Sequence, residues 1–192
     1  MAAPYPSLTL GVLGAVAALR AAELAFSALA LRAGRRAGRA RALPEPAFPW
    51  LVAVHAGWLL GCLVEGLGFP SRLPPALLAL AGALWAASLL LRAWLMASLG
   101  RLWNVRIVAR PEQPIVTAGP YAWVRHPNYL AVVLEIAAVP LLVGAVGTAL
   151  LGSLANALLL FFRIRAEEAY LFAQPGYSAA FAGKKRFLPG LF

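Results

Sequence analysis

The strongest constraint on the fold is a set of long apolar runs, three of which occupy most of the first half of the chain. They cover Ser7–Leu31, Phe48–Leu67 and Pro75–Met96, and a transmembrane helix needs about 20 mostly apolar residues. The chain of 192 residues is 62% hydrophobic and only 12% charged, with a mean hydropathy of +0.77. Such a chain has too little polar surface to cover a soluble globule, so we predict a polytopic membrane protein.

Two shorter apolar runs follow, at Tyr129–Val143 and Thr148–Phe162, and the turn GAVG joins them. At this length they form either a helical hairpin across a thinned region of bilayer or a helix pair that extends beyond it at the cytoplasmic end. Beyond Arg165, aromatic residues are interleaved with a basic KKR triplet. This composition is typical of an interfacial amphipathic helix.

The predicted fold class is therefore all-α, a polytopic membrane helical bundle of about five transmembrane helices with a cytoplasmic C-terminal amphipathic helix. No period of 20 to 50 residues recurs, so no internal repeat is predicted. We treat residues 1–192 as a single membrane domain. In it, residues 1–96 form a three-helix scaffold and residues 97–192 form the functional core.

The basic residues indicate how the spans are oriented. With the N-terminus outside, five crossings place 14 of the 17 Lys and Arg on one side, the exceptions being Arg20, Arg72 and Arg92. Because basic residues favour the cytoplasmic side, we expect the C-terminus there. The loop RAGRRAGRAR also predicts affinity for anionic membrane lipids, whereas arginines placed between apolar runs argue against nucleic-acid binding. The Ala- and Arg-rich composition suggests a bacterial source, and hence the inner (cell) membrane.

A few polar residues interrupt the apolar runs. Arg20 and Glu23 are three apart and are expected to pair on a face that points into the bundle, because a lone charge facing lipid is costly. His55 has no second histidine at metal spacing, so we interpret it as an interhelical hydrogen-bonding residue. Cys62 is the only cysteine and is expected to be a packing residue. No metal site is predicted, and the role of Glu65 stays open.

An aromatic and basic stretch, TAGPYAWVRHPNYL, lies at Thr117–Leu130 between the apolar runs. In it His126 precedes Pro127, which disfavours helix at the histidine and favours a helix that starts just after it. At such a helix entrance, free backbone N–H groups and the helix dipole can receive an anionic group such as a carboxylate. Three aromatic residues can pack around a heteroaromatic ring or a cation: Tyr121, Trp123 and Tyr129.

A second charged stretch, RIRAEE, follows the last apolar run. Arg163 and Glu167 are four apart, and Arg165 and Glu168 are three apart, so both pairs can lie on one side of a helix. On spacing alone, an ordinary salt-bridged helix end is the simpler interpretation. The last two apolar runs are antiparallel, however, so this stretch returns to the membrane face of the histidine. We therefore predict that the two stretches meet and form an active site.

Taken together, GPYAWVRHPNYL, an apolar hairpin and RIRAEEAYL resemble the isoprenylcysteine carboxyl methyltransferase family of integral membrane enzymes. The signature of that family resembles RHPxYxG, a hydrophobic stretch and then a paired glutamate. The similarity covers roughly residues 99–189 and does not include the first two apolar runs. One position departs from it, because Ala131 stands where the last glycine of the first motif is expected.

The resemblance implies a cofactor, S-adenosylmethionine, enclosed at the cytoplasmic end of the bundle. It implies a cofactor-binding set that consists of Gln113, Pro114, Ile115, Val116, Tyr121, His126, Pro127, Asn128, Tyr129, Glu167 and Glu168. In this set Glu167 resembles the acidic contact to the cofactor, and Glu168 resembles a support for the pocket. Arg163 resembles the residue that steers the substrate, so Arg163 and Glu167 are the predicted catalytic residues.

The chemistry of these residues agrees with that allocation. A sulfonium cofactor is positively charged, so a glutamate and an aromatic face are suitable partners. A carboxylate acceptor needs no general base and Arg163 could orient it, whereas a phenol needs a base, for which His126 and Glu167 are candidates. Arg106 stands where an uncharged contact is expected, so it is left out of the site. Glu45, in the first loop, is expected to matter little.

The acceptor is expected to be lipophilic, since a soluble acceptor would not need a membrane enzyme. Candidates are a prenylated or alkylated carboxylate, a phenol such as an alkyl-resorcinol, and a phospholipid amine. Two other classes of function stay open. A sterol-type membrane reductase would use NADPH, but no Gly-rich phosphate loop is visible. A non-catalytic membrane scaffold would need only the bundle. The sequence does not predict the oligomeric state.

Overall fold

The computed structural model describes residues 6–110 and 114–187, most of which lie in helices. The long helices are α1 (Pro6–Arg36), α2 (Phe48–Gly68), α3 (Pro75–Leu99), α4 (Pro127–Leu142) and α5 (Val146–Phe172). The short elements are β1 (Arg41–Ala42), η1 (Gly100–Leu102), β2 (Val108–Ala109), η2 (Gly119–Ala122) and α6 (Tyr177–Ala180).

The helices form a membrane bundle, as the apolar runs predict. In the described part of the chain, α1, α2, α3 and α5 are long and apolar enough to cross a membrane, and α4 is a shorter apolar helix. Large apolar side chains are exposed along them, for example Leu150, Leu151 and Leu154, each about 70% exposed. Such a surface is stable against lipid rather than water. The predicted fold class is confirmed.

The predicted ends of the helices need correction. The last apolar run was expected to end at Phe162, but α5 continues to Phe172, so the helix is longer than the apolar run. Helix α1 likewise runs on through the first arginines of the basic loop to Arg36. Less of the C-terminal tail is helical than expected. Between α5 and residue 187 the only helix is the four-residue α6, preceded by Gly176 at φ +81°.

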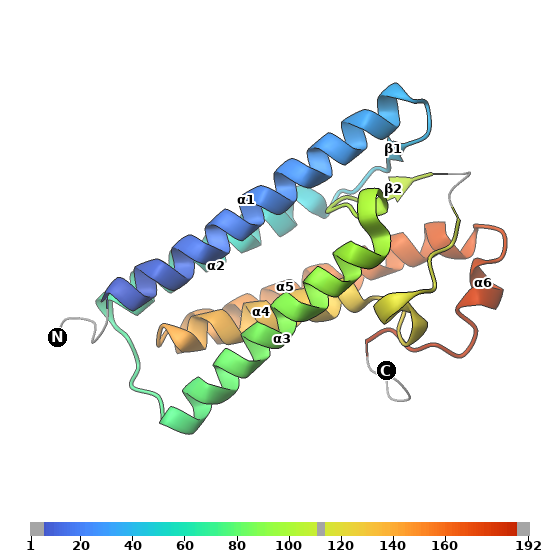
Figure 1. The fold of residues 1–192 in the computed structure, drawn as a ribbon. Helices are drawn as coiled ribbons and strands as arrows, with labels where there is room; N and C mark the ends of the chain where they lie inside the picture. The colour runs from blue at the N-terminus through green and yellow to red at the C-terminus, as the bar shows by residue number, and fades with distance from the viewer. Residues whose placement is uncertain (1–5, 111–113, 188–192) are drawn as a thin grey trace.

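The helices are arranged in two groups (Figure 1). Helix α1 packs on α2, while α3 packs along α4 and α4 along α5, and α2 joins the groups through its contacts with α5. The core between them is apolar and includes Val16, Trp58, Ile136 and Val139. Cys62 is fully buried in this core, which confirms that it is a packing residue.

Local chemistry explains where several helices begin and turn. Proline occupies the first turn of α2, α3 and α4, where its missing N–H has no helical partner to lose. The α4–α5 turn needs Gly144, which has φ +73°, and an added Cβ there would lie 2.7 Å from the carbonyl oxygen of Ser71. Glu65 of α2 caps α5 by accepting hydrogen bonds from the amides of Gly147 and Thr148, both at 2.8 Å.

A cluster of four charged side chains links α1 to α3 and α4 inside the bundle. Arg20 pairs with Glu23 at 2.8 Å, as predicted, and Arg92 pairs with Glu135 at 2.8 Å and with Glu23 at 3.3 Å. Arg92 itself is buried in this cluster. His55 was predicted to form a hydrogen bond between helices, but its Nδ1 lies 2.8 Å from the carbonyl oxygen of Leu51 on its own helix.

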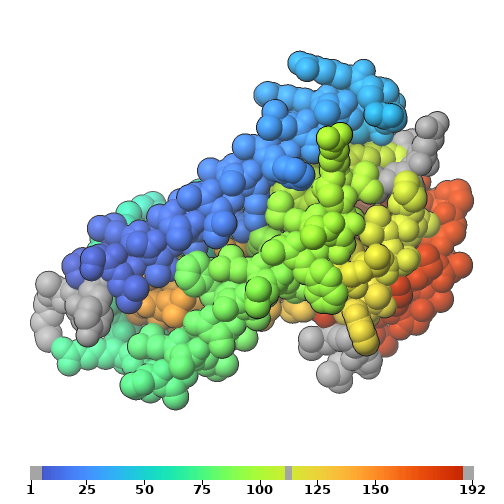
Figure 2. Space-filling model, viewed as in Figure 1, coloured from blue at the N-terminus to red at the C-terminus, as the bar shows by residue number. Residues whose placement is uncertain are grey.

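One end of the bundle collects the loop between α1 and α2, the connector between α3 and α4 (residues 100–126) and the C-terminal segment (Figures 1 and 2). Strands β1 and β2 pair antiparallel and tie the first loop to the connector. Asn104 of the connector donates to the carbonyl of Ser27 at 3.1 Å and accepts from its hydroxyl at 2.9 Å. The connector is thus held in place although it contains little regular structure.

The charge cluster should be required for the packing of α1 against the other helices. Glu135→Gln leaves Arg92 short of one carboxylate, and breaking a buried ion pair costs about 3–5 kcal/mol. We expect a clearly lower thermal unfolding midpoint in detergent, measured by circular dichroism. Arg72→Gln is the matched control, because Arg72 is exposed in the α2–α3 turn. Equal midpoints for the two variants would contradict the stabilising role of the cluster.

Candidate active site

The two charged stretches that the sequence singled out meet at one histidine. His126 Nε2 lies 3.1 Å from Glu168 Oε1, and His126 Nδ1 lies 3.4 Å from Glu167 Oε2. The histidine is the residue before the first turn of α4, as its position ahead of Pro127 predicts, and it is 4% exposed. The predicted convergence of the start of α4 with the end of α5 is therefore confirmed.

A tyrosine extends this contact to Arg163. The ring of Tyr129 stacks on His126 with a centroid distance of 5.4 Å. Its hydroxyl accepts a hydrogen bond from Arg163 Nε at 2.9 Å, and Arg163 Nη2 also donates to the carbonyl oxygen of Val105 in the connector. The guanidinium is therefore fixed by α4 and the connector together, at a position where its remaining N–H groups can bind an anion.

The C-terminal segment closes over the histidine from the other side. The amides of Arg125 and His126 donate to the carbonyls of Lys185 and Arg186, both at 2.9 Å. Arg186 Nη2 also lies 2.6 Å from Glu168 Oε2. This hydrogen bond raises the pKa of the Arg186 guanidinium, so the residue stays charged at any ordinary pH. The segment is thus attached by both backbone and side-chain bonds.

A cavity of about 310 Å³ lies between the connector, the start of α4, the end of α5 and the C-terminal segment. This volume is within the range of small-molecule sites, roughly 300–1,000 Å³. Of the predicted site residues, those that line it are Pro114, Ile115, Val116, Tyr121, His126, Asn128, Tyr129, Arg163 and Glu167.

Two predicted residues do not line the cavity, and the structure does not describe a third. Pro127 is buried in the first turn of α4 and does not line the cavity. Glu168 does not line it either, because its carboxylate is directed to His126 and Arg186. Gln113 lies outside the described residues. The first two therefore support the cavity wall rather than form its surface.

Several lining residues were missed by the sequence analysis. Tyr170 and Gln174 follow Glu167 at spacings of three and seven, so they lie on the same face of α5 and helical periodicity could have identified them. Arg106, which was left out, lines the cavity as well. Tyr177 also lines it, and burial raises the pKa of both its phenol and that of Tyr121, so the two rings stay neutral.

Three lining residues carry buried side-chain atoms that have no hydrogen-bond partner within residues 6–110 and 114–187. These atoms are Asn128 Oδ1, an acceptor, and two donors, Trp103 Nε1 and Arg125 Nε. A buried polar atom without a partner is costly unless a ligand or water completes it. The cavity therefore has the properties of a site for a polar ligand. Among the same residues no group of three His, Cys, Asp or Glu side chains could hold a metal ion.

A second cavity of about 450 Å³ lies on another side of Arg163, between the start of α2 and α5. Its lining is mostly apolar and includes Pro46, Trp50, Leu159 and Phe162, and Arg163 lines both cavities.

Glu45 is another lining residue of the second cavity. Although it lies in the loop between α1 and α2, it is not exposed. Its side chain is 3% exposed and its carboxylate pairs with Arg106 at 2.9 Å and with Arg163 at 3.4 Å.

Comparisons with known proteins agree with the motifs. Residues 80–173 match the profile of the isoprenylcysteine carboxyl methyltransferase (ICMT) family. The chain is also 36% identical over 152 residues to the uncharacterized protein YpbQ of Bacillus subtilis (strain 168), an alignment that covers 79% of this chain and 89% of that protein. The match to the family begins inside α3 and ends just after α5.

The attachment of the C-terminal segment can be tested directly. Arg186→Ala removes the side-chain bond to Glu168, so the amides of Arg125 and His126 should exchange with deuterium at least several-fold faster, as measured by mass spectrometry. Lys185→Ala is the control, because its exposed side chain is removed while its carbonyl still accepts the Arg125 amide. Unchanged exchange in Arg186→Ala would mean that the backbone bonds alone hold the segment.

Proposed function

This chain belongs to the isoprenylcysteine carboxyl methyltransferase family, and we propose that it transfers the methyl group of S-adenosylmethionine to the carboxylate or hydroxyl of a lipophilic acceptor. The family indicates a membrane methyltransferase. The observation that carries the finer proposal is the common cavity of His126, Glu167 and Arg163, which brings an acidic and a basic group to one small-molecule site.

The residues of the 310 Å³ cavity fit the cofactor. S-adenosylmethionine, when bound, supplies an electrophilic methyl group on a positively charged sulfonium. The carboxylate of Glu167 faces the same cavity and can balance positive charge there. The unsatisfied Asn128 Oδ1 and Trp103 Nε1 offer an acceptor and a donor for a heteroaromatic base. The amides at the start of α4, next to His126, can receive a carboxylate.

Arg163 is suited to hold the acceptor because it lines both cavities. Its guanidinium would bind the acceptor oxygen by charge-assisted hydrogen bonds, while the apolar second cavity would take the hydrocarbon chain. Holding the acceptor still in a site with little water supplies much of the rate of such a displacement. A carboxylate acceptor needs no base. For a hydroxyl acceptor, His126 or Glu167 would remove the proton.

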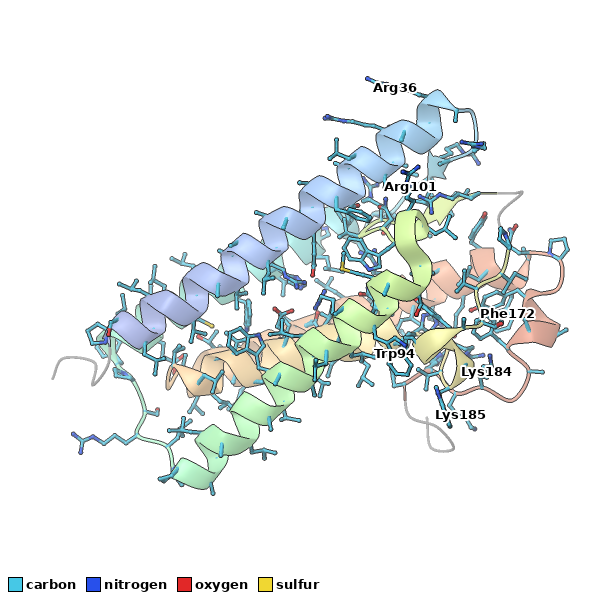
Figure 3. The ribbon with its side chains drawn as sticks, viewed as in Figure 1. Arg36, Trp94, Arg101, Phe172, Lys184 and Lys185 are labelled. Atoms are coloured by element: carbon cyan, nitrogen blue, oxygen red, sulfur yellow. The ribbon has the colours of Figure 1, made fainter. Side chains whose placement is uncertain are left out.

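We also propose an orientation in the membrane. Figure 3 shows Arg36, Arg101, Lys184 and Lys185 at the end of the molecule that holds β1, β2 and α6. Since basic residues favour the cytoplasmic side, we place this end, the site and the C-terminus in the cytoplasm and the N-terminus outside, in a bacterial cell membrane. Residues 97–192 then carry the methyltransferase core, and residues 1–96 form a scaffold in the same domain.

Binding of the cofactor can be measured on the purified protein by calorimetry. We expect S-adenosylmethionine to bind, and His126→Ala and Glu167→Ala each to weaken binding at least tenfold, about 1.4 kcal/mol. Arg165→Ala, an exposed change on the same helix, should leave binding unchanged. Tight binding of NADPH with none of S-adenosylmethionine would instead favour a membrane reductase. Binding of neither would favour a scaffold.

The acceptor can be identified with methyl-labelled cofactor and three lipids: a farnesylated thioether carboxylate, a pentadecyl-resorcinol and phosphatidylethanolamine. We expect label in the carboxylate or the resorcinol, and Arg163→Ala should slow turnover at least tenfold with little change in cofactor affinity. Arg163→Lys should retain part of the activity, because it keeps the charge but loses the paired donors. Unchanged labelling in Arg163→Ala would refute the role of this residue, and label in phosphatidylethanolamine alone would point to phospholipid N-methylation.

A further inference from the structure

We propose that Glu45 is a positioning residue for methyl transfer, which holds Arg163 and Arg106 in the wall between the two cavities. This inference rests on the proposed function, and it adds a residue from the loop between α1 and α2, outside the matched residues 80–173.

The carboxylate of Glu45 is hydrogen-bonded through one oxygen atom, and its other oxygen has no hydrogen-bond partner among the described residues but faces Arg163. Oε1 accepts hydrogen bonds from Arg106 Nε at 2.9 Å and from the Ile107 amide at 2.8 Å. Oε2 lies 3.4 Å from Arg163 Nη2. Both arginines also line the cavity proposed for the cofactor. Glu45 therefore contacts two of the arginines that line that cavity, Arg106 and Arg163, from the side of the second cavity.

The loop that carries Glu45 is rigidly attached at this point. The Leu43 amide donates to the carbonyl of Ile107 at 2.9 Å, and the adjoining residues pair as β1 and β2. The ring of Phe48 lies under the guanidinium of Arg106 at 4.3 Å and near that of Arg163 at 5.9 Å. A carboxylate fixed in this way can orient two flexible arginine side chains at little further entropic cost.

Arg163 needs such a partner because a second carboxylate competes for it. Glu167 follows one turn later on α5 and lines the same cavity. Without Glu45, the guanidinium would lose its attraction toward the second cavity and would shift toward Glu167. That shift would turn the arginine away from the acceptor. A buried arginine left with one carboxylate fewer is also costly, which favours such a rearrangement.

The test is a double-variant cycle with Glu45→Gln and Arg163→Lys, using the lipid of the three-member panel that the wild type methylates fastest. Glutamine keeps an oxygen for Arg106 and the Ile107 amide but loses the charge facing Arg163. We expect Glu45→Gln to lower kcat about tenfold, where kcat is expressed per cofactor-binding site and the sites are counted by calorimetry. The Kd for S-adenosylmethionine should stay within twofold of the wild-type value. Adding Glu45→Gln to Arg163→Lys should cause no further loss, because Glu45 acts through Arg163.

Glu65→Gln is the matched control. Like Glu45, Glu65 accepts hydrogen bonds from backbone amides, but it lies near the other end of α2. It should lower the thermal midpoint and leave kcat per binding site unchanged. If Glu45→Gln does not fold, Glu45→Asp, which keeps the charge on a shorter side chain, replaces it in the cycle.

The inference is overturned if Glu45→Gln keeps the wild-type kcat. It is also overturned if the fold-decrease in kcat of the double variant equals the product of the two single fold-decreases, as expected for independent effects. A wild type that binds no S-adenosylmethionine would instead overturn the proposed function, and this inference with it.

Discussion

The structure depends on the pairing of charges that the bundle takes out of water. Lipid offers no partner for an ionised group, so each charge needs one within the protein. Inside the bundle, Arg92 pairs with both Glu23 and Glu135. At the end that holds the site, Arg163 pairs with Glu45 and donates a hydrogen bond to Tyr129. The first set joins α1 to α3 and α4, and the second set lies in the walls of the two cavities.

The pairing also explains how an irregular connector can form a binding surface. In residues 100–110 and 114–126 the structure describes only short elements, η1, β2 and η2. The connector is nevertheless bonded to several different parts of the protein. Asn104 is tied to α1, Val105 to Arg163 of α5, and the Tyr121 carbonyl to Lys184 of the C-terminal segment. Three elements that are distant in sequence thus fix one loop, and that loop supplies much of the cavity wall.

The sequence could predict whatever depends on local pattern. Apolar length identified the helices, and two antiparallel runs were enough to bring His126 to Glu167. The ends of the helices were harder to predict. Hydropathy identifies only the apolar part of a helix, and α5 remains helical beyond its apolar run to Phe172. Glu45 and Arg186 could not be predicted, since a single charged residue in a loop carries no signal of its distant partner. Their roles follow from tertiary packing alone.

The charges around the cavity also affect which class of acceptor the proposed methyltransferase would bind. The cavity proposed for the cofactor is lined by Glu167 and by several arginines, namely Arg106, Arg110, Arg125 and Arg163. Glu45 pairs with Arg106 and Arg163, and Glu168 pairs with Arg125. The cofactor would add a sulfonium, an ammonium and a carboxylate, and so one net positive charge. An acceptor oxygen that enters as an anion would offset this added charge in a poorly hydrated site, where unbalanced charge is most costly. A protonated amine would add to the imbalance, and this favours a carboxylate or an acidic hydroxyl over a phospholipid amine.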